Sequence, residues 1–373
     1  RFDPVLHCVI SLTEERALKQ ARQADAEIAA GHYRGLLHGI PWGAKDLFAV
    51  RGYPTTWGAA PYREQHFAAD ASVVKRLDVA GAVLLAKLSL GALGKGDRWF
   101  GERTRNPWDP QRGSSGSSAG PAAAVSAGLL GFAIGSETCG SILDPSAVCG
   151  VVGLRPTFGR VSRYGAMALS WSMDKVGPIC RTAEDAACVF DIIRGPDDQD
   201  GTVVDLPFNW DAQRDLQGLR VGYACRGNGA AETNAWRSLN AIEQLVGAEP
   251  VSVQAPDFPV YLQELVFEVE AAAAFDELTR TNRDDELICQ EFEAWPNVFR
   301  TARFVPAVEY IQANRMRTKL MGAVDEIMQD LDVLVCPSPG DPMSSNLTGH
   351  PMVGLPNGFD DQGLPTGVAL MGR

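Results

Sequence analysis

Two loops rich in serine and glycine, joined by a short alanine-rich segment, constrain most strongly how this chain can fold. They lie within Gly113 to Pro145, which reads GSSGSSAGPAAAVSAGLLGFAIGSETCGSILDP. Loops of this composition are usually flexible linkers. Here, however, apolar runs typical of buried elements bracket both loops. The pattern therefore predicts backbone folded tightly around something small.

The composition is that of a globular protein. The chain has 373 residues, of which 45% are hydrophobic and 21% charged, and we expect one domain over residues 1–373. A net charge of −12 argues against direct binding of nucleic acid through a basic face. No apolar run is long enough for a membrane helix. The eight cysteines include no CxxC pair, so we expect free thiols in a reducing compartment, with no metal and no cofactor.

The two ends of the sequence lack the usual marks of a complete chain. It begins with Arg1 and stops at Arg373, just after a strand-like run. We expect a fragment truncated at both ends. A cytoplasmic location is expected, and an upstream targeting signal is left open.

Helical patterns alternate with short apolar runs along the chain. The pattern Ser11-Leu12-Thr13-Glu14 predicts a capping box at the start of a helix. Asp70 is expected to cap a second helix, and Thr182 is expected to start a third. Residues 260–330 look helical and polar-faced, as expected for a cap over one side of a sheet. The alternation predicts an α/β fold around a mostly parallel or mixed sheet. Strands are expected at residues 39–46, 82–86, 132–135, 219–223 and 331–336.

Serine, lysine and cysteine are the reactive residues that remain after simple alternatives are removed. A Ser-His-Asp site needs a histidine near its nucleophile, and the chain has only five histidines. Residues 116–120 match a GxSxG string, but the polar residues 106–112 before it cannot form the strand of a nucleophile elbow. At residues 136–141 a strand runs into a polar turn. Its backbone N–H groups can converge as an oxyanion hole, although composition alone also fits a plain turn.

Several motifs in order resemble the amidase signature family. Residues 113–124 are similar to its glycine- and serine-rich signature, 135–142 to its nucleophile loop and 39–46 to its lysine motif. The likeness covers residues 20–195 and 302–373, and it implies an amidase-signature fold, a central twisted mixed sheet flanked by helices. Further family-like segments are 149–157, 159–165, 177–179, Arg181, 346–347 and 363–365.

The resemblance implies a role for each matching residue. Ser141 would attack the amide carbonyl, and Ser117, after a cis peptide, would pass a proton between Ser141 and Lys45. The N–H groups of Thr138, Cys139, Gly140 and Ser141 would hold the oxyanion. To accept a proton near pH 7, Lys45 needs its pKa lowered by about three units from about 10.4. Burial does this, so we expect Asp46 to point away, towards backbone donors.

The chain departs from the family pattern at two places. Cys139 stands where the family usually has glycine. Its thiol is either a competing nucleophile or a small side chain beside the oxyanion hole, and the second interpretation is favoured because no histidine is visible to activate the thiol. Leu143-Asp144 stands where the family often has arginine, which predicts that acidic substrates are poor. Candidate walls of the substrate pocket are Trp99, Phe100, Asp144, Trp171 and Met173.

The sequence is compatible with three functions. The first is a stand-alone amidase that cleaves a small or aryl-type carboxamide, alone or as a homo-oligomer. The second is the glutaminase subunit of a tRNA-dependent amidotransferase, although residues 280–304 do not resemble the arginine-rich glutamine-binding stretch expected there. The third is an inactive scaffold or binding protein, which the presence of Lys45, Ser117 and Ser141 disfavours.

Overall fold

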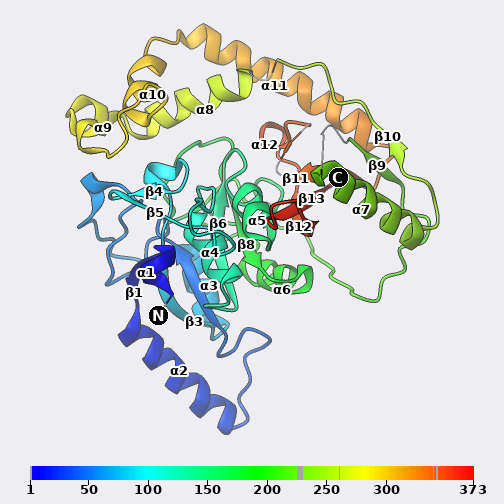
Figure 1. The fold of residues 1–373 in the computed structure, drawn as a ribbon. Coiled ribbons are helices and arrows are strands. Elements are labelled where there is room, and N and C mark those ends of the chain that lie inside the picture. Colours follow the sequence, from blue (N-terminus) through cyan, green and yellow to red (C-terminus); the bar gives the residue numbers. More distant parts are fainter. Residues whose placement is uncertain (1, 225–229, 260, 339, 342) are drawn as a thin grey trace.

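A large mixed sheet forms the centre of the molecule in the computed structural model (Figure 1). The structure describes residues 2–224, 230–259, 261–338, 340–341 and 343–373. Within these residues, β4 (Arg98–Trp99) and β5 (Glu102–Arg103) pair separately from the large sheet. From one edge to the other, the eleven described strands of that sheet are β1 (Val9–Leu12), β3 (Val83–Leu88), β2 (Pro41–Lys45), β6 (Phe132–Glu137), β8 (Lys175–Cys180), β7 (Val152–Arg155), β12 (Met352–Phe359), β13 (Pro365–Gly372), β11 (Val333–Ser338), β9 (Val221–Tyr223) and β10 (Val251–Ser252).

Helices flank this sheet, so the predicted α/β class is confirmed (Figure 1). Among the residues that the structure describes, three short 3₁₀ helices lie at Ala60–Tyr62, Ala92–Gly94 and Arg283–Glu286. The α-helices of the described residues are α1 (Asp3–Leu6), α2 (Glu14–Ala29), α3 (Ser72–Val79), α4 (Ala119–Ser126), α5 (Leu143–Cys149), α6 (Ala183–Ile193), α7 (Ala230–Val246), α8 (Tyr261–Ala274), α9 (Asp276–Arg280), α10 (Trp295–Ala302), α11 (Ala307–Met328) and α12 (Ser345–Thr348).

The sheet is mixed in strand direction, as predicted. Strand β2 runs parallel to both β3 and β6, whereas β8 is antiparallel to β6 and to β7. Every residue of β8 is buried. Strands covered on both faces read as continuous apolar runs rather than alternating ones, which explains why these strands appear in the sequence as short apolar blocks.

The helical cap expected over residues 260–330 is present. Helices α8 to α11 form an arc over one end of the sheet, yellow to orange in Figure 1. The arc has its own aromatic packing, because the rings of Trp295 and Phe299 stack with centroids 4.9 Å apart. Both side chains are buried. Such packing supplies the apolar burial that holds a polar-faced helical segment in place.

Two predicted helix caps are wrong, although both helices are present as α2 and α3. Ser11 lies in β1, and the residue before α2 is Thr13, whose hydroxyl donates to the carbonyl of Leu84 at 2.6 Å instead of capping the helix. Asp70 accepts a hydrogen bond from the Arg51 N–H at 2.7 Å and pairs with an arginine, so it does not cap α3. The predicted start at Thr182 is confirmed, because its side chain accepts the Asp185 N–H at 3.0 Å.

The parallel strands bring the predicted site residues to one edge of the sheet. Lys45 is the last residue of β2, and the turn 138–142 follows β6, the parallel neighbour of β2. Carboxyl ends of adjacent parallel strands meet at the same edge, which is where α/β proteins place their sites. The start of α4, at Ala119, follows directly after Ser117 and Ser118.

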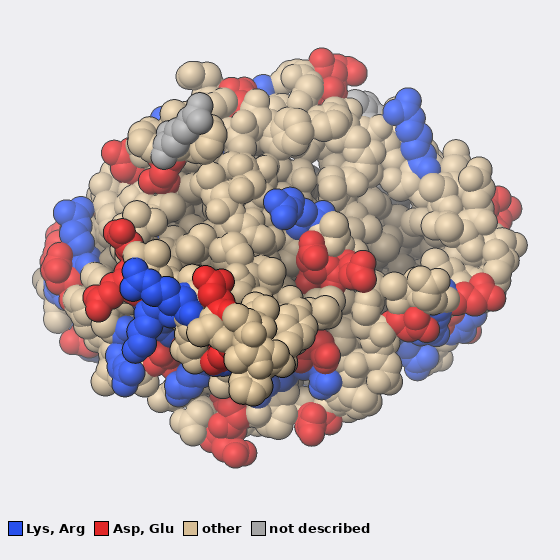
Figure 2. All heavy atoms as spheres, turned by 90° about the horizontal axis from the view of Figure 1, so that it is seen from below, with Lys and Arg blue, Asp and Glu red and all other residues tan. Residues whose placement is uncertain are grey.

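The surface carries both signs of charge. On the face shown in Figure 2, acidic and basic side chains lie intermixed around the rim. The helices of the described residues include none with the length and apolar character that crossing a membrane requires.

Candidate active site

Lys45 is fully buried and lies among three serines. Its Nζ is 2.9 Å from Ser117 Oγ, 3.0 Å from Ser118 Oγ and 2.9 Å from Ser136 Oγ. Burial lowers the pKa of Lys45 to about 7, against the opposing effect of the carboxylates of Asp174 and Glu137. A neutral amine donates two hydrogen bonds and accepts one. Lys45 is therefore placed to accept a proton from one of these hydroxyls near neutral pH.

Asp46 points away from Lys45, as expected. Its carboxylate accepts the backbone N–H of Thr56 at 2.9 Å and forms an ion pair with Lys87 at 2.5 Å. Both members of that ion pair are buried. The prediction of backbone donors is confirmed, while the Lys87 partner was missed. Because Lys87 takes up this charge, Asp46 does not hold Lys45 in its ammonium form.

The Ser117 loop has the backbone that the resemblance implied. The peptide bond between Gly116 and Ser117 is cis. A Cβ at residue 116 would lie 1.9 Å from the carbonyl oxygen of Gly96, so only glycine fits there. Ser117 itself is almost completely buried, with 3% of its surface exposed. The close approach of the Gly96 segment thus explains why this loop is glycine-rich.

The turn after β6 presents free backbone donors. None of the N–H groups of Thr138, Cys139, Gly140 and Ser141 donates a hydrogen bond to any part of the chain that the structure describes. Cys139, Gly140 and Ser141 are partly exposed, and Gly140 has a φ of 100°. Unpaired N–H groups in a tight turn suit a developing oxyanion.

Buried charges hold this turn in place. Glu137 accepts the N–H groups of Ile142 and Leu143 at 2.8 and 2.9 Å, and pairs with Arg155 at 2.7 Å. Asp174 accepts the Thr138 hydroxyl at 2.6 Å. Sequence reasoning missed these supporting residues. Glu137 and Arg155 do lie inside the family-like segments, so charged residues within otherwise apolar stretches were the available signal.

Ser141 is linked to the serine loop through its backbone. The Ser118 N–H donates to the Ser141 carbonyl at 3.0 Å. Lys45 and Ser117 are joined directly, but within the described residues no hydrogen bond joins the Ser141 hydroxyl to either of them. The structure therefore brings two of the three predicted catalytic residues into contact and places the third on a neighbouring, tethered turn.

Cys139 is partly exposed and packs against apolar residues of the core. Burial raises the pKa of its thiol to about 12, so the thiol stays protonated near neutral pH. Reactive cysteines need the thiolate. These properties disfavour the competing nucleophile considered for this position and fit a small side chain beside the turn.

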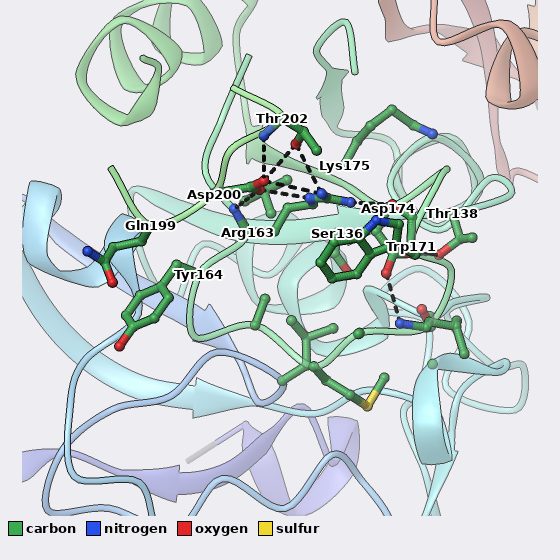
Figure 3. A pocket seen from close by; sticks show the side chains of 18 of the residues that line it. Ser136, Thr138, Arg163, Tyr164, Trp171, Asp174, Lys175, Gln199, Asp200 and Thr202 are labelled. Atoms are coloured by element: carbon green, nitrogen blue, oxygen red, sulfur yellow. Dashed lines mark hydrogen bonds and ion pairs between the residues drawn. The ribbon is translucent and has the colours of Figure 1, made fainter. Parts of the chain in front are cut away.

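A mostly apolar cavity of about 440 Å³ reaches the two serines Ser117 and Ser136 (Figure 3). Met167 and Leu169 are among its apolar walls. On one side, Arg163 pairs with Asp200 at 2.9 Å, and Figure 3 shows this pair linked to Thr202. A cavity of this kind suits an apolar group with a polar reacting end.

The five predicted wall residues are distributed over four places. Trp171 lines the apolar cavity with its side chain largely exposed. Met173 is fully buried in the core. Trp99 and Phe100 contact each other edge to face, 5.2 Å between ring centroids, at the β4–β5 hairpin, outside both described cavities that border residues 136–141. Asp144 lines the second of these cavities, which has a volume of about 840 Å³.

Comparison with known proteins gives one consistent family. The Amidase family model matches residues 1–345. The glutamyl-tRNA(Gln) amidotransferase A subunit of Acaryochloris marina is 36% identical over 426 residues, covering 100% of this chain and 88% of that protein. The peptide amidase of Stenotrophomonas maltophilia aligns with a TM-score of 0.87 and 30% identity, over 100% of this chain and 87% of that one.

A second solved structure connects the two kinds of relative. The glutamyl-tRNA(Gln) amidotransferase A subunit of Thermotoga maritima aligns with a TM-score of 0.81 and 28% identity, covering 100% of this chain and 85% of that chain. The family model and the solved structures thus agree on the fold. The chain belongs to the Amidase family, the amidase signature enzymes.

Proposed function

We propose that this protein hydrolyses a carboxamide through an acyl-enzyme formed on Ser141. The observation that carries the proposal is the buried Lys45, with a pKa of about 7, hydrogen-bonded at 2.9 Å to Ser117 beside a turn with unpaired N–H groups. A base poised near the working pH is what general base catalysis needs. The N–H groups of residues 138–141 supply the second requirement, a place for the oxyanion.

The proposed reaction uses the three residues as one proton path. Lys45 Nζ takes the proton of Ser117, Ser117 takes that of Ser141, and Ser141 Oγ bonds to the carbonyl carbon. As the tetrahedral intermediate collapses, the C–N bond breaks and the proton returns through Ser117 to the leaving ammonia or amine. Water then attacks the ester along the same path and releases the acid.

A backbone hydrogen bond between the loop of Ser117 and the turn of Ser141 supports this proton path. The Ser118 N–H holds the Ser141 carbonyl at 3.0 Å, which keeps Ser141 beside the residue that follows Ser117. A rotation about χ1 of Ser141 is the only local change that we propose for closing the relay. Catalytic hydrogen bonds are often long or misaligned without substrate and tighten when it binds.

A second candidate is the glutaminase subunit of a tRNA-dependent amidotransferase. The names of the curated relatives favour this role over the stand-alone amidase, because several of them, at 34 to 36% identity, are glutamyl-tRNA(Gln) amidotransferase A subunits. The likeness to the peptide amidase speaks for the stand-alone enzyme. As an amidotransferase component the chain would act with partner subunits, and as a stand-alone enzyme it would act on a small amide alone.

Two measurements test the chemistry and then separate the roles. A fluorophosphonate probe should label wild-type protein at Ser141, and Ser141→Ala and Lys45→Ala should lose labelling. Absence of labelling in the wild type would favour the inactive scaffold. Release of ammonia is then measured from glutamine and from a panel of neutral and amine-bearing amides. Glutamine as the preferred substrate, or co-purification with partner subunits, supports the amidotransferase role, and preference for another amide supports the stand-alone enzyme.

A further inference from the structure

A carboxylate of the helical cap reaches residues 169–174, a segment that lines the apolar cavity. Glu270 lies on α8, and its Oε2 accepts the Ser170 hydroxyl at 2.6 Å and the Ser172 N–H at 3.0 Å. Its Oε1 accepts the Ser172 hydroxyl at 2.8 Å. Hydrogen bonds to a carboxylate are stronger than those between neutral groups. Glu270 therefore ties the cap firmly to this segment.

A second helix of the cap holds the same carboxylate and the same segment. The Tyr310 hydroxyl of α11 donates to Glu270 Oε1 at 2.7 Å. Further along α11, Arg317 donates to the Ser172 hydroxyl at 2.7 Å and to the Ser172 carbonyl at 2.9 Å. Both oxygens of Glu270 are thus engaged, and α8 and α11 fix the segment together.

The other side of the segment leads to the turn after β6. Asp174 accepts the N–H groups of Leu169 and Ser170 at 2.8 and 3.0 Å through its Oδ2. Its Oδ1 accepts the Thr138 hydroxyl at 2.6 Å, and Figure 3 shows these two residues side by side. Ser170 therefore bridges two carboxylates, because its hydroxyl binds Glu270 and its N–H binds Asp174. One residue separates the cap from the carboxylate that holds the turn.

We propose that Glu270 is a positioning residue for the reaction at Ser141, acting through Ser170 and Asp174 on the turn 138–141. The proposal rests on the proposed function of Ser141. Within the described residues, Glu270 has no hydrogen bond to any of the three predicted catalytic residues. Its effect is to fix the place from which Asp174 holds the turn. The N–H groups of that turn must be held in place before an oxyanion develops.

The same contacts extend to the predicted base. Asp174 is the carboxylate that most strongly raises the pKa of Lys45 against the effect of burial, and Glu137 of β6 acts in the same direction. A displaced Asp174 would support the ammonium form less well. The inflection in the pH dependence of kcat/KM would then move to lower pH.

The test replaces Glu270 by glutamine, whose NH₂ group cannot accept the hydrogen bonds that one carboxylate oxygen takes. Glu270→Gln should lower kcat roughly 10-fold or more, with little change in KM, because the reacting groups are misplaced. The inflection should move to lower pH. Glu264→Gln, at an exposed position on the same helix, should change neither. Steady-state kinetics with one amide substrate between pH 6 and 9 measure both quantities.

Two further measurements distinguish positioning from a general loss of stability. Amide hydrogen exchange in residues 169–174 should become about 10-fold faster in Glu270→Gln and in Ser170→Ala, and stay unchanged in Glu264→Gln. In a double-variant cycle, Glu270→Gln should add little to the loss of kcat caused by Asp174→Asn, because both act through one carboxylate.

The outcomes separate this inference from the proposed function. Equal kcat and equal exchange in Glu270→Gln and Glu264→Gln would overturn the positioning role. Losses from Glu270→Gln and Asp174→Asn that multiply in the double variant would overturn it too. A wild-type protein that neither labels at Ser141 nor hydrolyses any amide would overturn the proposed function, whereas the hydrogen exchange would still report whether Glu270 holds the segment.

Discussion

Lys45 Nζ lies 2.9 Å from Ser117 Oγ, although the two residues are 72 positions apart in the chain. One stands at the end of β2 and the other just before α4. The contact forms because β2 and β6 are parallel neighbours and α4 packs against this part of the sheet. The sheet thus places the buried amine of Lys45 beside the hydroxyl groups of the serines.

The buried amine predicts a pH dependence of catalysis. With a pKa of about 7, Lys45 becomes neutral as pH rises through that value, so kcat/KM should rise with pH and level off above about pH 8. Below pH 7, kcat/KM should fall with a slope that approaches tenfold per pH unit. Asp174 helps to keep Lys45 protonated, so Asp174→Asn should move the inflection to lower pH. The pH dependence of kcat/KM, measured with one amide substrate for the wild type and for Asp174→Asn, checks both the rise and the shift. A flat profile of the wild type between pH 6 and 8 would contradict the role of Lys45 as base.

The residues of this site were predicted through the resemblance of compact, ordered motifs to the amidase signature family, since composition alone also fitted a plain turn. Lys45 ends a short apolar run, and the serine and glycine of residues 113–118 leave few backbone shapes other than a tight loop. The fold class was predictable for a similar reason. Strands that are buried on both faces produce uninterrupted apolar blocks, and the helices between them carry a regular apolar stripe.

The remaining features depend on contacts that no local pattern records. Ser118 and Ser136 become partners of Lys45 only when three separate segments meet. Similarly, Ser11 suits a helix cap by residue type, but it lies in β1 and pairs with β3 instead. Local propensity gives way to such long-range pairing. The second cavity also joins residues from distant loops, such as Asp257 and Asp341, which no local pattern places beside Asp144.

Lys175 predicts a stability change with a defined pH slope. It is buried, and burial lowers the pKa of its ammonium to about 7, with Arg155 acting in the same direction. Between pH 7 and 10.5 the unfolded chain binds a proton at this lysine that the folded protein does not, so this residue destabilises the fold more as pH falls. Lys175→Met should therefore raise the free energy of unfolding, by a margin that shrinks by about 1.4 kcal/mol per unit as pH rises from 7 to 9. Urea unfolding at three pH values measures it, and a margin independent of pH would contradict it.

The buried pair of Glu137 and Arg155 predicts strong coupling. Both side chains are inaccessible to solvent and lie 2.7 Å apart. Removing one charge leaves the other buried without its partner, so Glu137→Gln should cost about 3–5 kcal/mol, and the double variant Glu137→Gln with Arg155→Met should cost less than the sum of the single variants. The exposed pair of Arg220 and Asp332, at 2.9 Å, is the control. Asp332→Asn should lower the free energy of unfolding far less than Glu137→Gln does. Additive losses in the buried cycle would show that the pair is not coupled.

Gly140 tests whether the shape of the 138–141 turn sets the rate. Its φ is 100°, a value that L side chains rarely adopt, and a Cβ there would meet Asp144 Oδ2 at 2.4 Å, so alanine strains the turn that carries the free N–H groups. Loss of one oxyanion donor lowers kcat by about 100-fold or more, and Gly140→Ala should fall in that range. Gly363 has a φ of 77°, and a Cβ there would meet nothing within 4 Å, so Gly363→Ala should cost roughly 1–2 kcal/mol of backbone strain and leave kcat unchanged. Comparing kcat and unfolding free energy for both variants separates the two effects. If the two variants lose activity equally, the cause is general backbone strain and not the donors of this turn.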